Sequence, residues 1–203
     1  MNTRVLRFYL FLLSAVSAPF FLQAEDLREV PKAGEVLFQF GVGGAEVDYP
    51  QELNGALDYL VDTLGYERMS IGLNLNLGVA LNDRSYLLLG VNGVGDRISG
   101  YDGFMQLNHY LYHIGARLYP ALTGLYIQGM FGFSALVIQS GYSETTIDET
   151  VTSDPGSGYG AVLGYDFGRA KGFGLALETS VLSVEIGGES VVSGALMLNL
   201  RWK

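Results

Sequence analysis

Hydrophobic and polar positions alternate along eight segments of the chain, and in one of them the alternation is strict. In Met69–Leu81 every odd position is apolar, and every even position is small or neutral polar. A period of two is the signature of a β-strand with two unlike faces. The other segments are residues 35–47, 86–94, 107–119, 125–139, 158–167, 173–184 and 191–202. The pattern therefore predicts an all-β protein of eight antiparallel strands.

The alternation alone fits two architectures, a soluble β-sandwich with an apolar core or a membrane barrel with an apolar outer surface. Most segments are about ten or more residues long, which suits a tilted strand that crosses a bilayer better than a typical soluble strand. Their polar faces carry mainly Gly, Ser, Asn and Ala, where a solvated face would carry Lys, Glu and Thr. Glycine is abundant, with 28 residues, and small side chains fit a narrow barrel interior. We therefore expect a transmembrane β-barrel.

The connections between the segments also differ in length. Residues 82–85, 120–124 and 168–172 form short connections with turn chemistry, whereas residues 48–68, 95–106 and 141–157 form longer, acidic ones. Short periplasmic turns and longer extracellular loops are the layout of an outer-membrane barrel. The last connection, residues 185–190, is short but falls on the extracellular side. Both chain ends are then expected in the periplasm.

The alternation assigns polar side chains to the lumen. Charges of both signs are among them, and charges buried in a closed lumen have to pair. From the sequence, Glu178 can pair with either Arg117 or Arg201. We interpret such pairs as a network that fills and rigidifies the lumen. The predicted lumen network consists of Glu46, Asn74, Asn76, His109, His113, Arg117, Gln128, Asp166, Glu178, Asn199 and Arg201.

The opposite faces are assigned to lipid. The aromatic residues lie near the segment ends, as in the girdles at membrane interfaces. Tyr86, Phe167, Phe173 and Trp202 are expected near the short turns, and Tyr110 and Tyr159 toward the other end. The predicted lipid-facing residues are Phe38, Phe40, Leu73, Leu75, Leu77, Ile114, Phe131, Phe133, Leu163, Leu177, Leu198 and Trp202.

The N-terminus has the pattern of a secretory signal peptide. Arg4 and Arg7 precede an apolar run over residues 8–22, which is too short for a spanning helix, and the small Ala24 follows it. We expect cleavage after Ala24. The predicted organisation is a signal peptide over residues 1–24, a periplasmic segment over 25–34 and the barrel over 35–203.

The chain is acidic and lacks cysteine. Its net charge is -9, and loss of the two arginines in residues 1–24 makes it -11. Such a charge repels nucleic acid, so we exclude nucleic-acid binding. Without cysteine, the chain has no disulfide framework, thiolate metal site or cysteine nucleophile.

In this architecture and pattern, the predicted mature chain resembles the small eight-stranded outer-membrane barrels of the OmpA, OmpX, OmpW and opacity-protein kind. The resemblance implies location in the cell outer membrane, contact with its lipid, and recognition of the C-terminal strand by the barrel-assembly machinery. We expect a monomer. The family typically ends on an aromatic residue, whereas this chain ends Trp202-Lys203, so Trp202 would be the assembly signal.

Some barrels of this size are lipid A enzymes, which need a serine and a base at the lipid-facing rim. The two histidines, His109 and His113, are both assigned to the lumen. Four residues apart on one strand, they lie about 13 Å apart and cannot share a metal ion. We predict no catalytic site, no metal site and no cofactor.

Apolar residues with helical spacing occur in the first long loop. They are Leu53, Leu57, Leu60, Val61 and Leu64. One interpretation is a short helix that caps the barrel mouth. The other is an apolar entrance for a small hydrophobic solute, or a contact with a partner. The acidic residues 141–157 are expected to form a solvated surface loop, with binding to a cation or to a host surface as the alternative. The leading function is a structural, surface-exposed barrel with a filled lumen. The competing function is a narrow passage for small or hydrophobic solutes.

Overall fold

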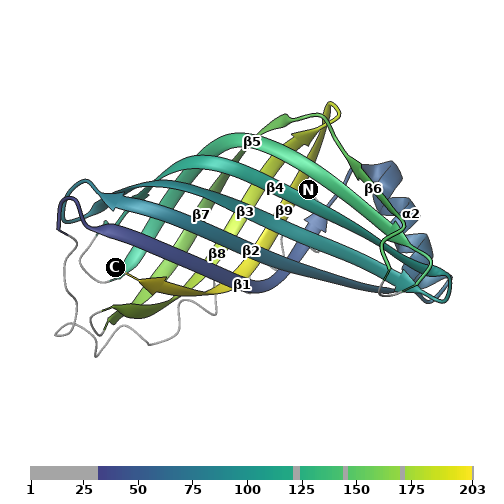
Figure 1. Ribbon diagram of the computed structural model, residues 1–203, viewed down its shortest axis with the longest axis horizontal. Helices are drawn as coiled ribbons and strands as arrows, with labels where there is room; N and C mark the ends of the chain where they lie inside the picture. Colours follow the sequence, from purple (N-terminus) through teal and green to yellow (C-terminus); the bar gives the residue numbers. More distant parts are fainter. Residues whose placement is uncertain (1–31, 121–123, 144–145, 170–171, 203) are drawn as a thin grey trace.

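The computed structural model describes residues 32–120, 124–143, 146–169 and 172–202. It is a closed barrel of eight antiparallel strands, with a helix at one end (Figure 1). The barrel strands are β1 (Val36–Asp48), β2 (Glu67–Ala80), β3 (Ser85–Gly100), β4 (Gly103–Leu118), β5 (Leu125–Gly141), β7 (Gly156–Arg169), β8 (Phe173–Ile186) and β9 (Glu189–Trp202). The helix is α2 (Gln51–Asp62), and a short strand, β6 (Glu149–Thr152), pairs with β5 outside the barrel. The predicted eight-stranded antiparallel barrel is confirmed.

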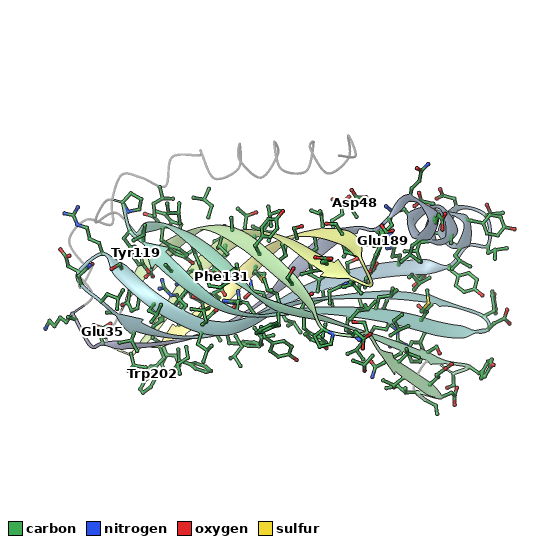
Figure 2. All side chains as sticks on the ribbon, turned by 90° about the horizontal axis from the view of Figure 1, so that it is seen from above. Glu35, Asp48, Tyr119, Phe131, Glu189 and Trp202 are labelled. Atoms are coloured by element: carbon green, nitrogen blue, oxygen red, sulfur yellow. The ribbon has the colours of Figure 1, made fainter. Side chains whose placement is uncertain are left out.

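Each strand pairs with its neighbours in the barrel, and β1 pairs with β9 to close the circle. The β2–β3, β4–β5 and β7–β8 connections lie at one end, which we call the turn end. The β1–β2, β3–β4, β5–β7 and β8–β9 connections lie at the other, the loop end, together with α2 (Figure 1). Glu35 and Trp202 mark the turn end in Figure 2, and Asp48 and Glu189 mark the loop end. The predicted signal peptide, residues 1–24, and most of the predicted segment 25–34 lie outside the described residues.

The pairings also give the shear of the barrel, which the pattern of residues does not reveal. From Phe38, successive partners are Leu77, Leu89, Ile114, Phe131, Tyr159, Ser183, Val192 and finally Asp48, ten residues further along β1. This stagger implies strands tilted by about 40° from the barrel axis. An eight-stranded barrel has an interior just wide enough for side chains, and the buried side chains of this barrel lie there.

Two of the predicted long loops are more ordered than expected. Residues 95–106 are not a loop, because β3 and β4 continue to Gly100 and Gly103 and leave only Tyr101 and Asp102 in the turn. The alternation continues through the charged residues of this region, with Asp96 inside and Arg97 outside. The connection over 141–157 contains β6. Only two connections at the loop end are therefore long.

Candidate functional site

The interior of the barrel holds ten of the eleven residues predicted for the lumen. Each of the ten is less than 9% exposed. The exception is Glu46, and its placement in the lumen was wrong. The register between β1 and β9 is continuous around Glu46, which pairs with Gly194, so the side chain keeps the outward orientation of the even positions of β1.

A hydrogen-bonded network surrounds the carboxylate of Glu178 on β8, and we call it the Glu178 network. Arg117 on β4 donates to Oε1 of Glu178 over 3.1 Å. Gln39 on β1 donates to the same oxygen over 2.8 Å, and Asn74 on β2 donates to Oε2 over 2.9 Å. The hydroxyl of Tyr126 on β5 also donates to Glu178. One buried carboxylate thus accepts bonds from four other strands.

Arg117 has further partners besides Glu178. Its Nη1 donates to Gln39 over 2.9 Å, and its Nε and Nη2 donate to Oε1 of Gln128 over 3.0 and 2.7 Å. The guanidinium carbon lies 4.2 Å from the centre of the Tyr126 ring. Gln39 also donates to Asn199 over 2.9 Å. Each nitrogen of the buried guanidinium thus has at least one acceptor, which offsets the cost of burying its charge.

A second ion pair lies closer to the turn end, where Arg201 bonds to Asp166. Arg201 also donates to the hydroxyl of Tyr119 over 2.7 Å. The Tyr119 ring contacts the rings of Tyr86 and Tyr126, with centroid distances of 6.3 and 5.3 Å. Tyr86 therefore lies inside the barrel, and the expectation that it belongs to the outer aromatic girdle was wrong. From the sequence, Glu178 could pair with either Arg117 or Arg201. In the structure, Glu178 pairs with Arg117, and Arg201 pairs with Asp166.

A separate polar cluster, the Asp96 cluster, lies inside the barrel toward the loop end. Arg68 contacts Asp96 over 2.7 Å, and the Ser70 hydroxyl donates to it over 2.8 Å. The hydroxyl of Tyr49, in the connection after β1, donates to Asp96 over 3.0 Å and lies 2.9 Å from Nε2 of His109. Burial and the negative charge of Asp96 raise the pKa of the Tyr49 phenol. Tyr49 thus connects the segment that leads into α2 with the barrel interior.

The Asp96 cluster was not predicted from the sequence, apart from His109. Asp96 was assigned to a loop, because charged residues interrupt the apolar pattern after Val94. A signal was present, since the inward positions of β3 continue through Val94, Asp96 and Ile98, which are all at most 3% exposed. Gln39 was also missing from the predicted network, although it follows the alternation of the polar positions on β1.

Helix α2 lies at the loop end (Figure 1) and contains the apolar residues predicted in the first long loop, apart from Leu64. Leu57 is buried, and Leu53 and Leu60 pack against the same hydrophobic core. Val61 is half-buried, whereas Leu64 follows the helix and is 51% exposed. Nδ2 of Asn54 donates to Asp48 and to the carbonyl of Tyr49, which ties the start of the helix to the end of β1. These contacts support the interpretation of α2 as a cap.

The two histidines occupy separate environments in the lumen. Nε2 of His113 lies 3.1 Å from Oδ1 of Asn92, while His109 contacts Tyr49. Neither Nδ1 atom has a hydrogen-bond partner among the described residues. Within the described ranges, no three histidine or carboxylate side chains are grouped so as to hold a metal ion.

The outer surface of the barrel carries all twelve residues predicted to face lipid, among them Phe131 and Trp202, which Figure 2 labels. Near the turn end, Trp202 pairs with Phe38 on one side and Phe173 on the other. The exposed Phe167 and its contact partner Tyr165 continue this aromatic band on β7. Further along the barrel, the outward aromatic residues are Tyr110, Tyr112, Phe131, Phe133 and Tyr159. An apolar belt flanked by aromatic residues is the surface of a transmembrane barrel.

In the described part of the chain, no helix is long and apolar enough to cross a membrane. A comparison with protein-family models and with curated proteins finds no match. Solved structures do match. Neisserial surface protein A (NspA) is 13% identical, with a TM-score of 0.54, over 83% of this chain and 96% of that one.

Two further solved structures show a weaker likeness. Ail, the attachment invasion locus protein of Yersinia pestis, is 16% identical over 83% of this chain and 99% of that one, with a TM-score of 0.49. The outer membrane protein OprG of Pseudomonas aeruginosa is 10% identical over 86% and 98%, with a TM-score of 0.43. The likeness to NspA, together with the register and the apolar belt, leads to one conclusion about the architecture. This chain has the fold of the small eight-stranded outer-membrane β-barrels.

Proposed function

We propose that this protein is an integral outer-membrane barrel that does not conduct solutes and that acts through the surface at its loop end. The observation that carries the proposal is the Glu178 network. It joins side chains of β1, β2, β4, β5 and β8 across the lumen. A solute on the barrel axis would have to break these bonds and leave the Arg117–Glu178 pair without its partners, at a cost of several kcal/mol.

The apolar belt supports lipid contact, and the barrel fold supports placement in the outer membrane. In this proposal, residues 1–24 direct export and are removed, the turn end faces the periplasm, and the mature chain is a monomer. Trp202, on the outer face of the last strand, is the residue that we assign to recognition by the barrel-assembly machinery.

The test is conductance of the purified protein in planar bilayers, with a general porin as the positive control. Folding is checked first by heat-modifiable migration on a gel and by a β-rich dichroism spectrum in detergent. We expect no channels above the background of the lipid alone. Reproducible channels from the folded protein would contradict a closed lumen, and a protein that is soluble without detergent would contradict membrane insertion.

The competing function, passage of small or hydrophobic solutes past residues 53–64, is tested in the same assay. Deletion of these residues removes most of α2 and its contacts with the core. If the folded chain conducts and this deletion abolishes the conductance, the loop is an entrance and the protein is a transporter. We expect the folded chain not to conduct and the deletion not to change this. The Glu178 network lies deeper in the barrel than α2 and does not depend on the helix.

A further inference from the structure

A cleft of about 370 Å³ lies at the loop end, between α2, the β3–β4 hairpin and the segment that joins β5 to β6. We call it the mouth cleft. Its apolar lining consists of Leu60, Tyr66, Ile98, Phe104 and Met105. This volume falls within the range of small-molecule sites, which are mostly apolar with a few polar groups at chosen positions.

Three carboxylates, those of Asp102, Asp148 and Glu149, also line the mouth cleft. They come from different segments, the β3–β4 turn and the residues at and before the start of β6. Asp148 accepts a hydrogen bond of 2.8 Å from the backbone N–H of Tyr142, which orients its side chain. None of the three forms an ion pair with any residue that the structure describes. Their charges are therefore available to a ligand.

Aromatic rings are unusually exposed beside these carboxylates. Tyr142, which lines the mouth cleft, is 88% exposed, and Tyr101 in the adjacent turn is fully exposed. The face of an aromatic ring attracts cations. The protein itself provides an example at this end, because the guanidinium carbon of Arg97 lies 4.1 Å from the centre of the Phe104 ring.

The electrostatic surroundings favour a cation as well. Described residues in the loop-end ranges 46–68, 96–102, 146–154 and 185–189 include thirteen carboxylates and two arginines. One of the arginines, Arg68, is paired with the buried Asp96. A surface with charge of one sign raises the local concentration of ligands with the opposite charge and speeds their association.

From these features, we propose that the mouth cleft binds a small organic cation, a protonated amine or guanidine on an apolar or aromatic stem. The charged group contacts Asp102, Asp148 and Glu149, and the stem packs on Tyr66, Ile98 and Met105. An apolar floor favours such a ligand over a hydrated metal ion, because a metal ion gains nothing from apolar contacts. The ligand binds at the rim of the barrel and does not enter the lumen. Binding here is therefore independent of whether the barrel conducts solutes.

Methionine methyl groups offer a direct test. The protein is labelled with [ε-¹³C]methionine in nanodiscs, and its methyl signals are followed during titration with phenethylammonium. Met105 lies in the floor of the mouth cleft, whereas Met130 and Met197 are buried inside the barrel and Met69 is on the outer face. We expect a saturable shift of the Met105 signal, with the other three unchanged. The neutral analogue 2-phenylethanol should shift Met105 at least 3-fold more weakly, because it lacks the charge.

Two double variants, each lacking two negative charges, separate a site from a general charge effect. Asp102→Asn/Glu149→Gln alters the mouth cleft, and Asp58→Asn/Glu189→Gln removes two loop-end carboxylates that do not line it. We expect the first to weaken phenethylammonium binding by about 3- to 10-fold, the effect of two exposed ion pairs, and the second by less than 2-fold. Unchanged Met130 and Met197 signals verify the fold. Equal losses in the two variants, equal binding of the alcohol, or no saturable shift would each overturn the proposal.

Discussion

Tyr126 and Gly164 show how closely side chains fit together inside the barrel. A Cβ atom on Gly164 would lie 2.2 Å from Cζ of Tyr126, because the tyrosine ring lies directly over the glycine backbone. The ring is completely buried, and its hydroxyl reaches Glu178 from this position. Gly164 therefore provides the space that the Glu178 network requires.

Substitution of Gly164 by alanine should consequently destabilise the barrel. The tyrosine has to move, which both strains the packing and weakens its bond to Glu178, and we expect a loss of about 1–3 kcal/mol in the free energy of unfolding. Gly129, an outward position on β5 with no atom within 4 Å of an added Cβ, is the matched control. Gly129→Ala should be neutral or slightly stabilising. Unfolding by urea in phospholipid vesicles measures both, and equal effects would contradict the close fit.

The two faces of β2 allow a second test. Leu75 is 43% exposed on the outer wall, whereas the neighbouring Asn76 is buried and its Oδ1 has no hydrogen-bond partner in the described structure. Leu75→Arg should reduce the free energy of unfolding in vesicles by about 2–4 kcal/mol, the cost of a charge near the bilayer midplane. Asn76→Ala should be tolerated, since it removes an unsatisfied carbonyl. If the two variants were equally stable, the assignment of inner and outer faces would be wrong.

At the scale of elements, the contact between α2 and the barrel depends on Tyr49. Its hydroxyl is bonded to Asp96 and lies beside His109, and both bonds are lost in Tyr49→Phe. Hydrogen exchange of the α2 amides should then become about 5- to 150-fold faster, as loss of about 1–3 kcal/mol from local stability implies. Tyr59→Phe is the control on the same helix, where the side chain is 56% exposed. Equal exchange rates in the two variants would show that Tyr49 does not hold α2.

The pH dependence of this contact follows from the raised pKa of Tyr49. A phenol whose pKa is higher in the folded than in the unfolded protein stabilises the fold fully below its ordinary pKa of about 10. The stabilisation is lost only as the pH rises through the higher, folded pKa. The difference in α2 exchange between the wild type and Tyr49→Phe should therefore be constant from pH 7 to 9. A difference that declined within this range would contradict the raised pKa.

Elements differ in how far the sequence predicts them. The alternation predicts the eight strands because, throughout the membrane, residues that face lipid are apolar whereas their neighbours that face the lumen are small or polar. Beyond the membrane the strands still alternate between inside and outside, but charged residues are tolerated there, so the ends of β3 and β4 and the short β6 were assigned to loops. Glu46 was misplaced for a related reason: its charge suggested the lumen, but it lies outside near the end of β1, where an outward charge is tolerated.

At the scale of the whole molecule, partners across the lumen depend on the shear. Arg117 and Glu178 lie on β4 and β8, which are not neighbours in the barrel, so their contact depends on the tilt and stagger of every strand between them. Alternation fixes which way each residue points but not how far the strands slide past one another. The sequence therefore predicted that these charges pair without deciding between Arg117 and Arg201.

Because Glu178 joins strands from all around the barrel, its loss should affect the whole fold. Glu178→Gln leaves Arg117 buried without a counter-charge and should lower the free energy of unfolding by about 3–5 kcal/mol. Arg117→Met/Glu178→Met removes both charges and should cost less than the single variant. Urea unfolding in vesicles measures this difference. A double variant less stable than the single would show that the ion pair itself, more than the avoidance of an unpaired charge, stabilises the barrel.

The pairing of β1 with β9 has a consequence for folding kinetics. Phe38 and Trp202 are neighbours in the barrel but lie 164 residues apart in the sequence, whereas most other strand pairs are hairpins. Local hairpins form quickly, but joining the two ends of the chain requires closure of a loop that contains the entire barrel. Until they join, β1 and β9 expose backbone groups that hydrocarbon cannot satisfy. We expect this final closure to limit the folding rate, so substitutions along the junction should slow folding more than equally destabilising ones within the hairpins.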